Sequence, residues 1–172
     1  MKERSGLVNI NGNPMTLVGN EIKVGDSAPE FEVLDNDLNP FLFSSKQQKI
    51  TIITSVSSLD TSVCDMETRR FNQEVSSLGD DVQVLAISMD LPFAQKRWCA
   101  AAGVKNVLTL SDHRNASFGM AYGVLIKEVR LLARAVFVVD KDNIVRYHEL
   151  VAEVGNEPDY QAALKAVREL NQ

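Results

Sequence analysis

The sequence has few cysteines, no excess of positive charge and no long apolar run. Two cysteines in 172 residues are too few for the disulfide scaffold of a small secreted domain. The net charge of −5 at pH 7, with acidic and basic residues interspersed, argues against a nucleic-acid-binding face and against an anionic-membrane face. No segment is long and apolar enough to span a bilayer, and the first residues lack the apolar core of a signal peptide. We therefore expect a cytoplasmic protein that binds neither nucleic acid nor membrane.

The signatures of bound cofactors are also absent. Neither type of Gly-rich phosphate loop occurs, so we expect no nucleotide and no flavin. His113 and His148 lie far apart in the chain, and neither has a second ligand at a suitable spacing, so we expect no metal ion. Any chemistry then has to come from the amino-acid side chains alone.

The hydrophobic pattern predicts one α/β domain over residues 1–172. With 45% hydrophobic residues, a chain of this length can bury one sizeable core. Short β-branched apolar runs at 49–56 and 82–89 are typical of strands buried on both faces of a sheet. Between these runs an amphipathic helix is expected. Its buried side is predicted to hold Val63, Met66, Phe71, Val75 and Leu78, and its solvent side Glu67, Arg69 and Arg70.

The remaining segments complete a central mixed sheet flanked by helices, with an N-terminal β-hairpin. Residues 8–19 alternate apolar and polar residues around an Asn-Gly turn, which is a strong hairpin signal. Residues 92–103 begin with proline and end with glycine, as helices do. Two β-rich runs in 134–150 flank a short turn and must be antiparallel, and residues 157–170 form an amphipathic helix. This order of elements occurs in thioredoxin-like folds.

Cys64 lies where the first long helix is expected to begin. If Thr61 is the N-cap, Cys64 is the third helical residue, beside unpaired backbone N–H groups and the positive end of the helix dipole. That position favours the reactive thiolate over the thiol. The Thr61 hydroxyl could donate to this sulfur or to an incoming oxygen. The plainer alternatives are that Cys64 is a small buried apolar residue and that Thr61 only caps the helix.

Cys99 lies on the next expected helix, so the two cysteines do not form the Cys-x-x-Cys pair of a thiol–disulfide exchanger. Two distant cysteines suit stepwise oxidation instead. A peroxide would convert Cys64 to a sulfenic acid, and Cys99 would then condense with it to a disulfide. Because the Cα atoms of a disulfide lie only about 4.4–6.8 Å apart, the helices would have to shift or fray.

Several motifs resemble the bacterial thiol peroxidases, the atypical two-cysteine peroxiredoxins. They are DTSVCDMETRRFN, DLPFAQKRWC, LSDHR and LLARAVFVVD, and the similarity extends over nearly the whole chain. The resemblance implies a thioredoxin-like homodimer that reduces hydrogen peroxide and organic hydroperoxides with electrons from thioredoxin. It makes Cys64 the peroxidatic cysteine, Cys99 the resolving cysteine and Thr61 the hydroxyl partner. It also makes Arg134 the cation that stabilises the thiolate and the transition state.

The sequence departs from the family motif Pro-x-x-x-Thr-x-x-Cys at one position, where Ser57 replaces the proline. Proline has no N–H and a fixed φ, so it limits the freedom of a loop and shields the thiolate from water. Our hypothesis is a looser, wetter pocket and a lower rate. The alternatives are that serine adopts the same backbone without consequence and that the residue was introduced by engineering.

Two other functions fit the same residues. The protein could be a peroxide sensor that oxidises and then binds a partner through the helix around Cys99, without efficient turnover. It could also be a structural or chaperone-like thioredoxin-fold protein whose cysteines are inert. The mass of the protein after treatment with peroxide, and turnover with a thioredoxin system, distinguish these possibilities.

Overall fold

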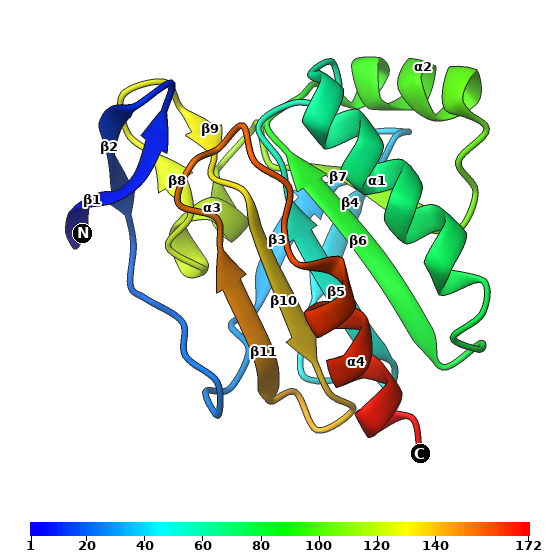
Figure 1. Ribbon diagram of the computed structural model, residues 1–172. Coiled ribbons are helices and arrows are strands. Elements are labelled where there is room, and N and C mark those ends of the chain that lie inside the picture. Colours follow the sequence, from blue (N-terminus) through cyan, green and yellow to red (C-terminus); the bar gives the residue numbers. More distant parts are fainter.

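The computed structural model describes residues 1–172, which form eleven strands and four helices (Figure 1). The helices are α1 (Ser62–Val75), α2 (Pro92–Ala102), α3 (Ser117–Ala121) and α4 (Tyr160–Leu170). The strands are β1 (Glu3–Ile10), β2 (Asn13–Val18), β3 (Phe31–Leu34), β4 (Pro40–Phe43), β5 (Ile50–Ser55), β6 (Val82–Ser88), β7 (Val107–Ser111), β8 (Leu125–Ile126), β9 (Leu131–Leu132), β10 (Ala135–Val139) and β11 (Val145–Leu150). No helix has the length and apolar character needed to cross a membrane.

The strands form two sheets. The larger one has seven strands in the order β11-β10-β5-β6-β7-β3-β4, and the smaller one has four in the order β1-β2-β8-β9. In the larger sheet β5, β6 and β7 are parallel, while β10 pairs antiparallel with both β5 and β11. The mixed sheet, the βαβ units and both predicted hairpins are therefore confirmed.

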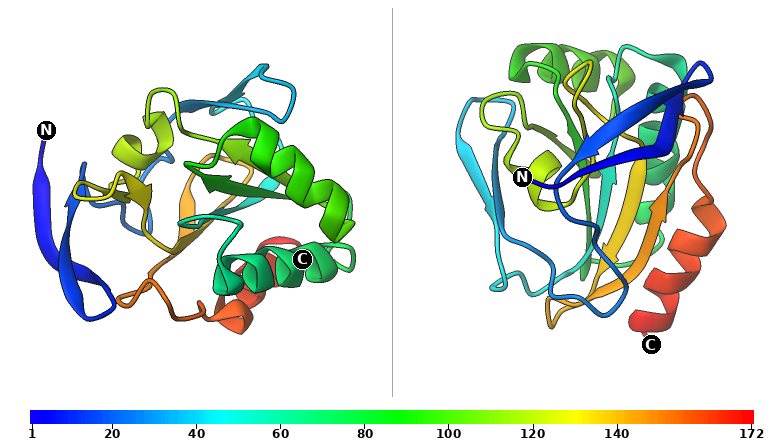
Figure 2. Two further views of the ribbon diagram at one scale, coloured as in Figure 1. Left: turned by 90° about the horizontal axis from the view of Figure 1, so that it is seen from above. Right: turned by 90° about the vertical axis from the view of Figure 1, so that its left-hand side faces the viewer.

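Two hydrophobic clusters cover the two faces of the large sheet. Because side chains alternate along a strand, Ile53 of β5 packs into one cluster and Ile52 into the other. The cluster around Ile53 includes Phe118 of α3, and the cluster around Ile52 includes Phe71 of α1 and Leu164 of α4. Figure 2 shows α3 with the N-terminal hairpin on one side and α1, α2 and α4 on the other.

Strand register brings two distant segments together at one end of this sheet. Strand β5 ends at Ser55 and leads into the loop before α1, and Ala135 of the antiparallel β10 lies opposite Ser55. Arg134, one residue before Ala135, therefore emerges beside the start of α1. Residues about seventy positions apart in the sequence share this edge, so pairing with β5 is what positions the site described below.

The helix over residues 62–75 buries Phe71 and Val75 as predicted, but two positions differ from the prediction. Glu67 was expected on the solvent side, but its exposed fraction is 0%, while Met66, expected inside, is 48% exposed. The buried residues of α1 are Cys64, Glu67, Thr68, Phe71 and Val75, which follow helical spacing from the cysteine. Arg69 and Arg70 do face solvent. The expectation for Glu67 was wrong because a buried cation compensates its charge, which a hydrophobicity pattern cannot register.

Candidate active site

Cys64 is the third residue of α1 and is fully buried. Thr61 is the N-cap with an extended backbone, as the sequence predicts, and the carbonyl of Thr61 accepts the first helical hydrogen bond from Asp65 N–H. The first N–H groups of a helix have no intrahelical partner and carry a partial positive charge. The sulfur therefore lies where backbone dipoles favour an anion.

Arg134 contacts Cys64 directly. Its Nη2 donates to Cys64 Sγ at 3.2 Å, its Nε donates to the Val154 carbonyl at 3.0 Å, and its Nη1 donates to Glu67 Oε2. The residue is only 1% exposed. Since each nitrogen of the guanidinium has an acceptor, the side chain is fixed in one orientation. A fixed cation beside a buried sulfur stabilises a thiolate and any negative charge that develops next to it.

Glu67 completes a buried network around the arginine. Its Oε1 accepts from the Thr54 hydroxyl while Oε2 accepts from Arg134. Burial raises the pKa of the Glu67 carboxyl, and Arg134 and the Thr54 hydroxyl act in the opposite sense. Burial also opposes the charge of Arg134, but Glu67 and Cys64 raise the pKa of the guanidinium above its usual value. The arginine is therefore a permanent cation held between a carboxylate and a sulfur.

Thr61 is exposed, and its hydroxyl does not make the bonds expected from the sequence. It donates to the Ser58 carbonyl at 2.9 Å, within a turn closed by Thr61 N–H, instead of capping α1 or contacting Cys64 Sγ. Because the only hydroxyl proton is committed to Ser58, the lone pairs of Thr61 Oγ1 are free to accept a hydrogen bond. The side chain can thus receive a proton donor that enters the site.

Ser57 occupies the position of the missing proline. It is buried, at 7% exposure, and its hydroxyl donates to the Leu132 carbonyl at 3.1 Å. This bond ties the loop before α1 to strand β9. A serine hydroxyl thus provides one of the restraints that a proline ring would provide by fixing φ.

A cleft of about 310 Å³ opens at the start of α1. Two predicted site residues, Thr61 and Arg134, line it together with Ser57. Cys64 is fully buried and does not line the cleft, but it contacts Arg134 in the cleft wall. The other lining residues of the cleft come from the tip of the N-terminal hairpin, the start of α1, strand β9 and the segment after β11, and are Ile10, Asn11, Ser62, Val63, Leu131, Glu153, Val154 and Gly155. The cleft combines apolar walls with a few polar groups, as small-molecule sites do.

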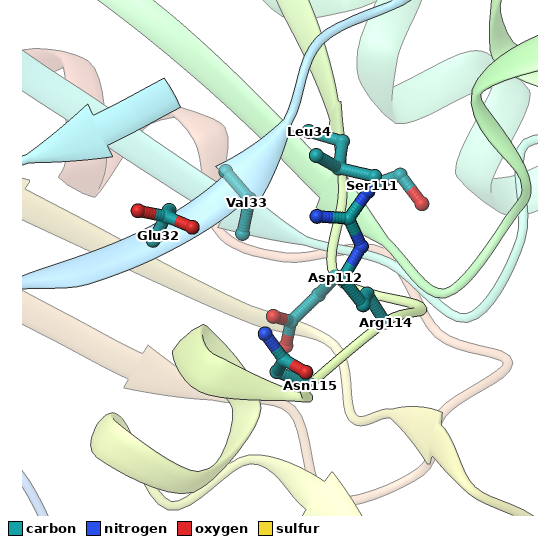
Figure 3. Close-up of a pocket in the computed structure, with 7 residues that line it drawn as sticks. All are labelled: Glu32, Val33, Leu34, Ser111, Asp112, Arg114 and Asn115. Atoms are coloured by element: carbon teal, nitrogen blue, oxygen red, sulfur yellow. The ribbon is translucent and has the colours of Figure 1, made fainter. Parts of the chain in front are cut away.

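Figure 3 shows a second recess, between β3 and the loop after β7. Neither cysteine lines it. Its Asp112 carboxylate accepts from the N–H groups of Phe118 and Gly119 at the start of α3, and burial raises the pKa of Asp112 to about 6. These bonds tie α3 to the sheet, so Asp112 has a structural role.

Cys99 lies outside the cleft. It is on α2, partly buried, and its Sγ contacts Thr109 Oγ1 of β7 at 3.2 Å and Asn36 Nδ2 at 3.9 Å. Between β7 and β10 in the sheet lie β5 and β6, and three strand spacings amount to roughly 14 Å. Both cysteines are free in this structure, and the expectation that the helices shift or fray when the disulfide closes stays a prediction.

Sequence reasoning missed Thr54, Asn36 and Thr109, and it assigned Glu67 to the solvent side of α1. Glu67 lies three residues after Cys64, so the two side chains share a helix face, and this spacing was the only available signal for it. Nothing in the sequence links Thr54, Asn36 or Thr109 to a cysteine, because their contacts depend on strand order. No cluster of three or more His, Cys, Asp or Glu side chains is arranged to hold a metal ion.

Comparison with known proteins agrees with this geometry. The family model described as Redoxin matches residues 23–164. A thiol peroxidase from Halalkalibacterium halodurans is 56% identical over 161 residues, covering 94% of this chain and 96% of that one. A thiol peroxidase from Bacillus subtilis is 53% identical over 163 residues, covering 95% and 97%. The crystal structure of a peroxiredoxin-like protein from Aquifex aeolicus superposes with a TM-score of 0.89, at 45% identity over 97% of both chains.

Proposed function

The chain belongs to the Redoxin family, in its thiol peroxidase group, and from this premise we propose that Cys64 is the peroxidatic cysteine. The protein is a thiol-dependent peroxidase with a thioredoxin-like fold. The observation that carries the proposal is the 3.2 Å contact between the buried Cys64 Sγ and Nη2 of Arg134, a residue that lines an open cleft. We also propose that residues 1–172 work as a single domain, since both hydrophobic clusters pack on the same seven-stranded sheet.

In the first step the Cys64 thiolate attacks the terminal oxygen of a hydroperoxide. An S–O bond forms and the O–O bond breaks, so the sulfur is oxidised to a sulfenic acid. The leaving oxygen takes a proton and departs as water or as an alcohol. Arg134 donates to the sulfur and to the developing negative charge, and Thr61 Oγ1 accepts the hydrogen bond of the incoming peroxide, since its own proton is bound to Ser58.

In the second step Cys99 acts as the resolving cysteine. Its thiol condenses with the sulfenic acid to give a Cys64–Cys99 disulfide and water. Thioredoxin then supplies two electrons and returns both thiols. The segregation of Cys99 from the cleft supports this order, because the first oxidation can finish before the second sulfur arrives. A cycle that ends in reduction by thioredoxin suits a reducing compartment such as the cytoplasm.

The substrates proposed are hydrogen peroxide and organic hydroperoxides. The apolar side chains Ile10, Val63 and Leu131 in the wall of the cleft support the second class, because they offer contact to an alkyl group. We propose a homodimer as the working form. Leu91 and Phe93 support it, since these large apolar side chains at the start of α2 are 52% and 65% exposed. Sedimentation at several protein concentrations measures the assembly.

The test is the intact mass of the protein after one equivalent of peroxide. The parent protein is expected to lose about 2 Da as the disulfide forms. The Cys99→Ser variant is expected to gain about 16 Da as a sulfenic acid, and Cys64→Ser is expected to keep its mass. An unchanged mass in the parent contradicts the proposal.

Turnover is measured next, with thioredoxin, its reductase and excess peroxide. We expect steady consumption of peroxide by the parent and none by Cys99→Ser, in which the first oxidation is intact but the cycle is blocked. Disulfide formation without turnover in the parent is the behaviour of a peroxide sensor and would replace the enzymatic cycle proposed here.

A further inference from the structure

Cys99 belongs to a small ring of polar side chains drawn from three separate elements. Thr109 Oγ1 on β7 donates to Asn36 Oδ1 at 3.0 Å, and Asn36 lies in the turn between β3 and β4. Cys99 Sγ on α2 lies 3.2 Å from Thr109 Oγ1 and 3.9 Å from Asn36 Nδ2. Each of the three side chains therefore contacts the other two.

The proton inventory assigns a direction to every contact in this ring. A threonine hydroxyl has one proton, and that of Thr109 is used in the bond to Asn36. Cys99 must then donate its S–H proton to Thr109 Oγ1, and the Asn36 amide N–H donates to Cys99 Sγ. The ring is complete only while Cys99 is a thiol. None of the atoms in contact with the sulfur carries a full charge, unlike the guanidinium at Cys64.

The ring also fixes where Cys99 lies before the disulfide forms. Its hydrogen-bond partners are on β7 and the β3–β4 turn, whereas Cys64 is bound by Arg134, just before β10, and β5 and β6 lie between β7 and β10 in the sheet. A disulfide needs Cα atoms within about 7 Å. Cys99 therefore has to leave both Thr109 and Asn36 before it can reach Cys64. The Lys96–Asp37 ion pair also joins α2 to this turn. Because both side chains are exposed, the pair is expected to contribute little to the stability of this contact.

We propose that Asn36 and Thr109 are positioning residues for the second step, which hold the Cys99 thiol against β7 and the β3–β4 turn and set the rate of disulfide formation through its release. The inference rests on the proposed role of Cys99 as resolving cysteine. On release, the Cys99 sulfur attacks the Cys64 sulfenic sulfur. The S–O bond breaks, the S–S bond forms, and the thiol proton leaves with the hydroxyl group as water.

The step is measured by mixing reduced protein rapidly with one equivalent of peroxide, quenching with an alkylating reagent and following the disulfide by mass. The test variant is Thr109→Val, which keeps the shape of the side chain and removes the hydroxyl. Loss of one such hydrogen bond is expected to speed closure about 2- to 10-fold. Formation of the Cys64 sulfenic acid, followed in Cys99→Ser backgrounds, should keep its rate. Asn36→Ala is the second variant and should act in the same direction.

Two controls separate positioning from general loosening of the fold. Thr109→Ser keeps the hydroxyl, so its Cys64–Cys99 disulfide should form at the parent rate. Thr51→Val removes another buried hydroxyl, on β5, which contacts Lys49 and Gln83 and no cysteine. It should lower stability to a similar degree without speeding closure.

Faster closure in Thr109→Val and Asn36→Ala, with rescue by serine, supports the inference. A parent that forms the disulfide while neither variant closes faster overturns this inference alone and leaves the peroxidase intact. Equal acceleration by Thr51→Val also overturns it. If Cys64 is oxidised in the parent but no disulfide forms, Cys99 is not the resolving cysteine. That result contradicts both the proposed second step and this inference.

Discussion

Cys64 and Cys99 are both contacted by polar side chains, but only the contacts of Cys64 are charged. At Cys64 a buried guanidinium donates to the sulfur and is itself bound by Glu67 and the Val154 carbonyl. At Cys99 a hydroxyl at 3.2 Å and an amide at 3.9 Å make neutral contacts, and the residue is partly exposed. Charged, buried bonds are strong and rigid, whereas neutral contacts of a thiol are weak. We therefore expect Cys64 to react where it is bound and Cys99 to be released from its contacts before it reacts.

Removal of the cation at Cys64 is expected to have the largest effect. Arg134→Met should slow oxidation of Cys64 by peroxide about 10²- to 10³-fold, because loss of a preorganised donor to developing charge has that cost. The measurement is the second-order rate constant at one equivalent of peroxide. Since the single variant leaves Glu67 buried without its partner, Arg134→Met combined with Glu67→Leu serves as the folded control. A rate near that of the parent in the double variant would remove Arg134 from the mechanism.

A large effect of comparable size is expected on stability, and it distinguishes the two regions. Glu67→Ala leaves Arg134 buried with one charge uncompensated and should lower the free energy of unfolding by about 3–5 kcal/mol. Asn36→Ala removes only neutral contacts and should lower it by about 0.5–1.5 kcal/mol. Urea denaturation of both variants provides the comparison. Equal losses would mean that the two cysteine environments do not differ as described.

Asp65 and Trp98 offer a smaller test, because each adjoins one of the two cysteines in sequence. Trp98 Nε1 donates to Asp65 Oδ1 at 2.8 Å, so this bond joins α1 to α2 through the sequence neighbours of the two cysteines. Asp65→Ala should remove the acceptor of this hydrogen bond and speed formation of the Cys64–Cys99 disulfide about 2- to 10-fold. Stopped-flow Trp98 fluorescence follows the change. Asp65→Asn, which retains an acceptor oxygen, is the matched control and should stay near the parent rate.

The smallest effect is expected at Ser57. Because its hydroxyl already ties the loop to Leu132, Ser57→Pro should raise the rate constant for peroxide only about 2- to 5-fold, the range of a rigidifying proline. Peroxide rate constants of the two proteins decide the matter. Equal rates would discard the loose-pocket hypothesis, and a much larger gain would mean that the serine loop is open in spite of its hydrogen bond.

The sequence predicted the order of elements and the start of α1 because hydrophobic periodicity, proline, glycine and N-cap signals are local. Thr61 as N-cap and Cys64 in the first turn of α1 followed from these signals. The burial of Glu67 did not, because it depends on Arg134, which β-sheet register brings from about seventy residues away. Asn36 and Thr109 were invisible for the same reason. Thr61 illustrates a further limit, since the choice of Ser58 as its acceptor depends on the conformation of one turn.

The reactivity of each sulfur toward peroxide tests the central claim most directly. In Cys99→Ser only Cys64 can be oxidised, and in Cys64→Ser only Cys99 can. We predict that one equivalent of peroxide rapidly converts Cys64 to a sulfenic acid, with a gain of about 16 Da, and leaves Cys99 unchanged over the same time. Oxidation of both sulfurs at the same rate would contradict the account.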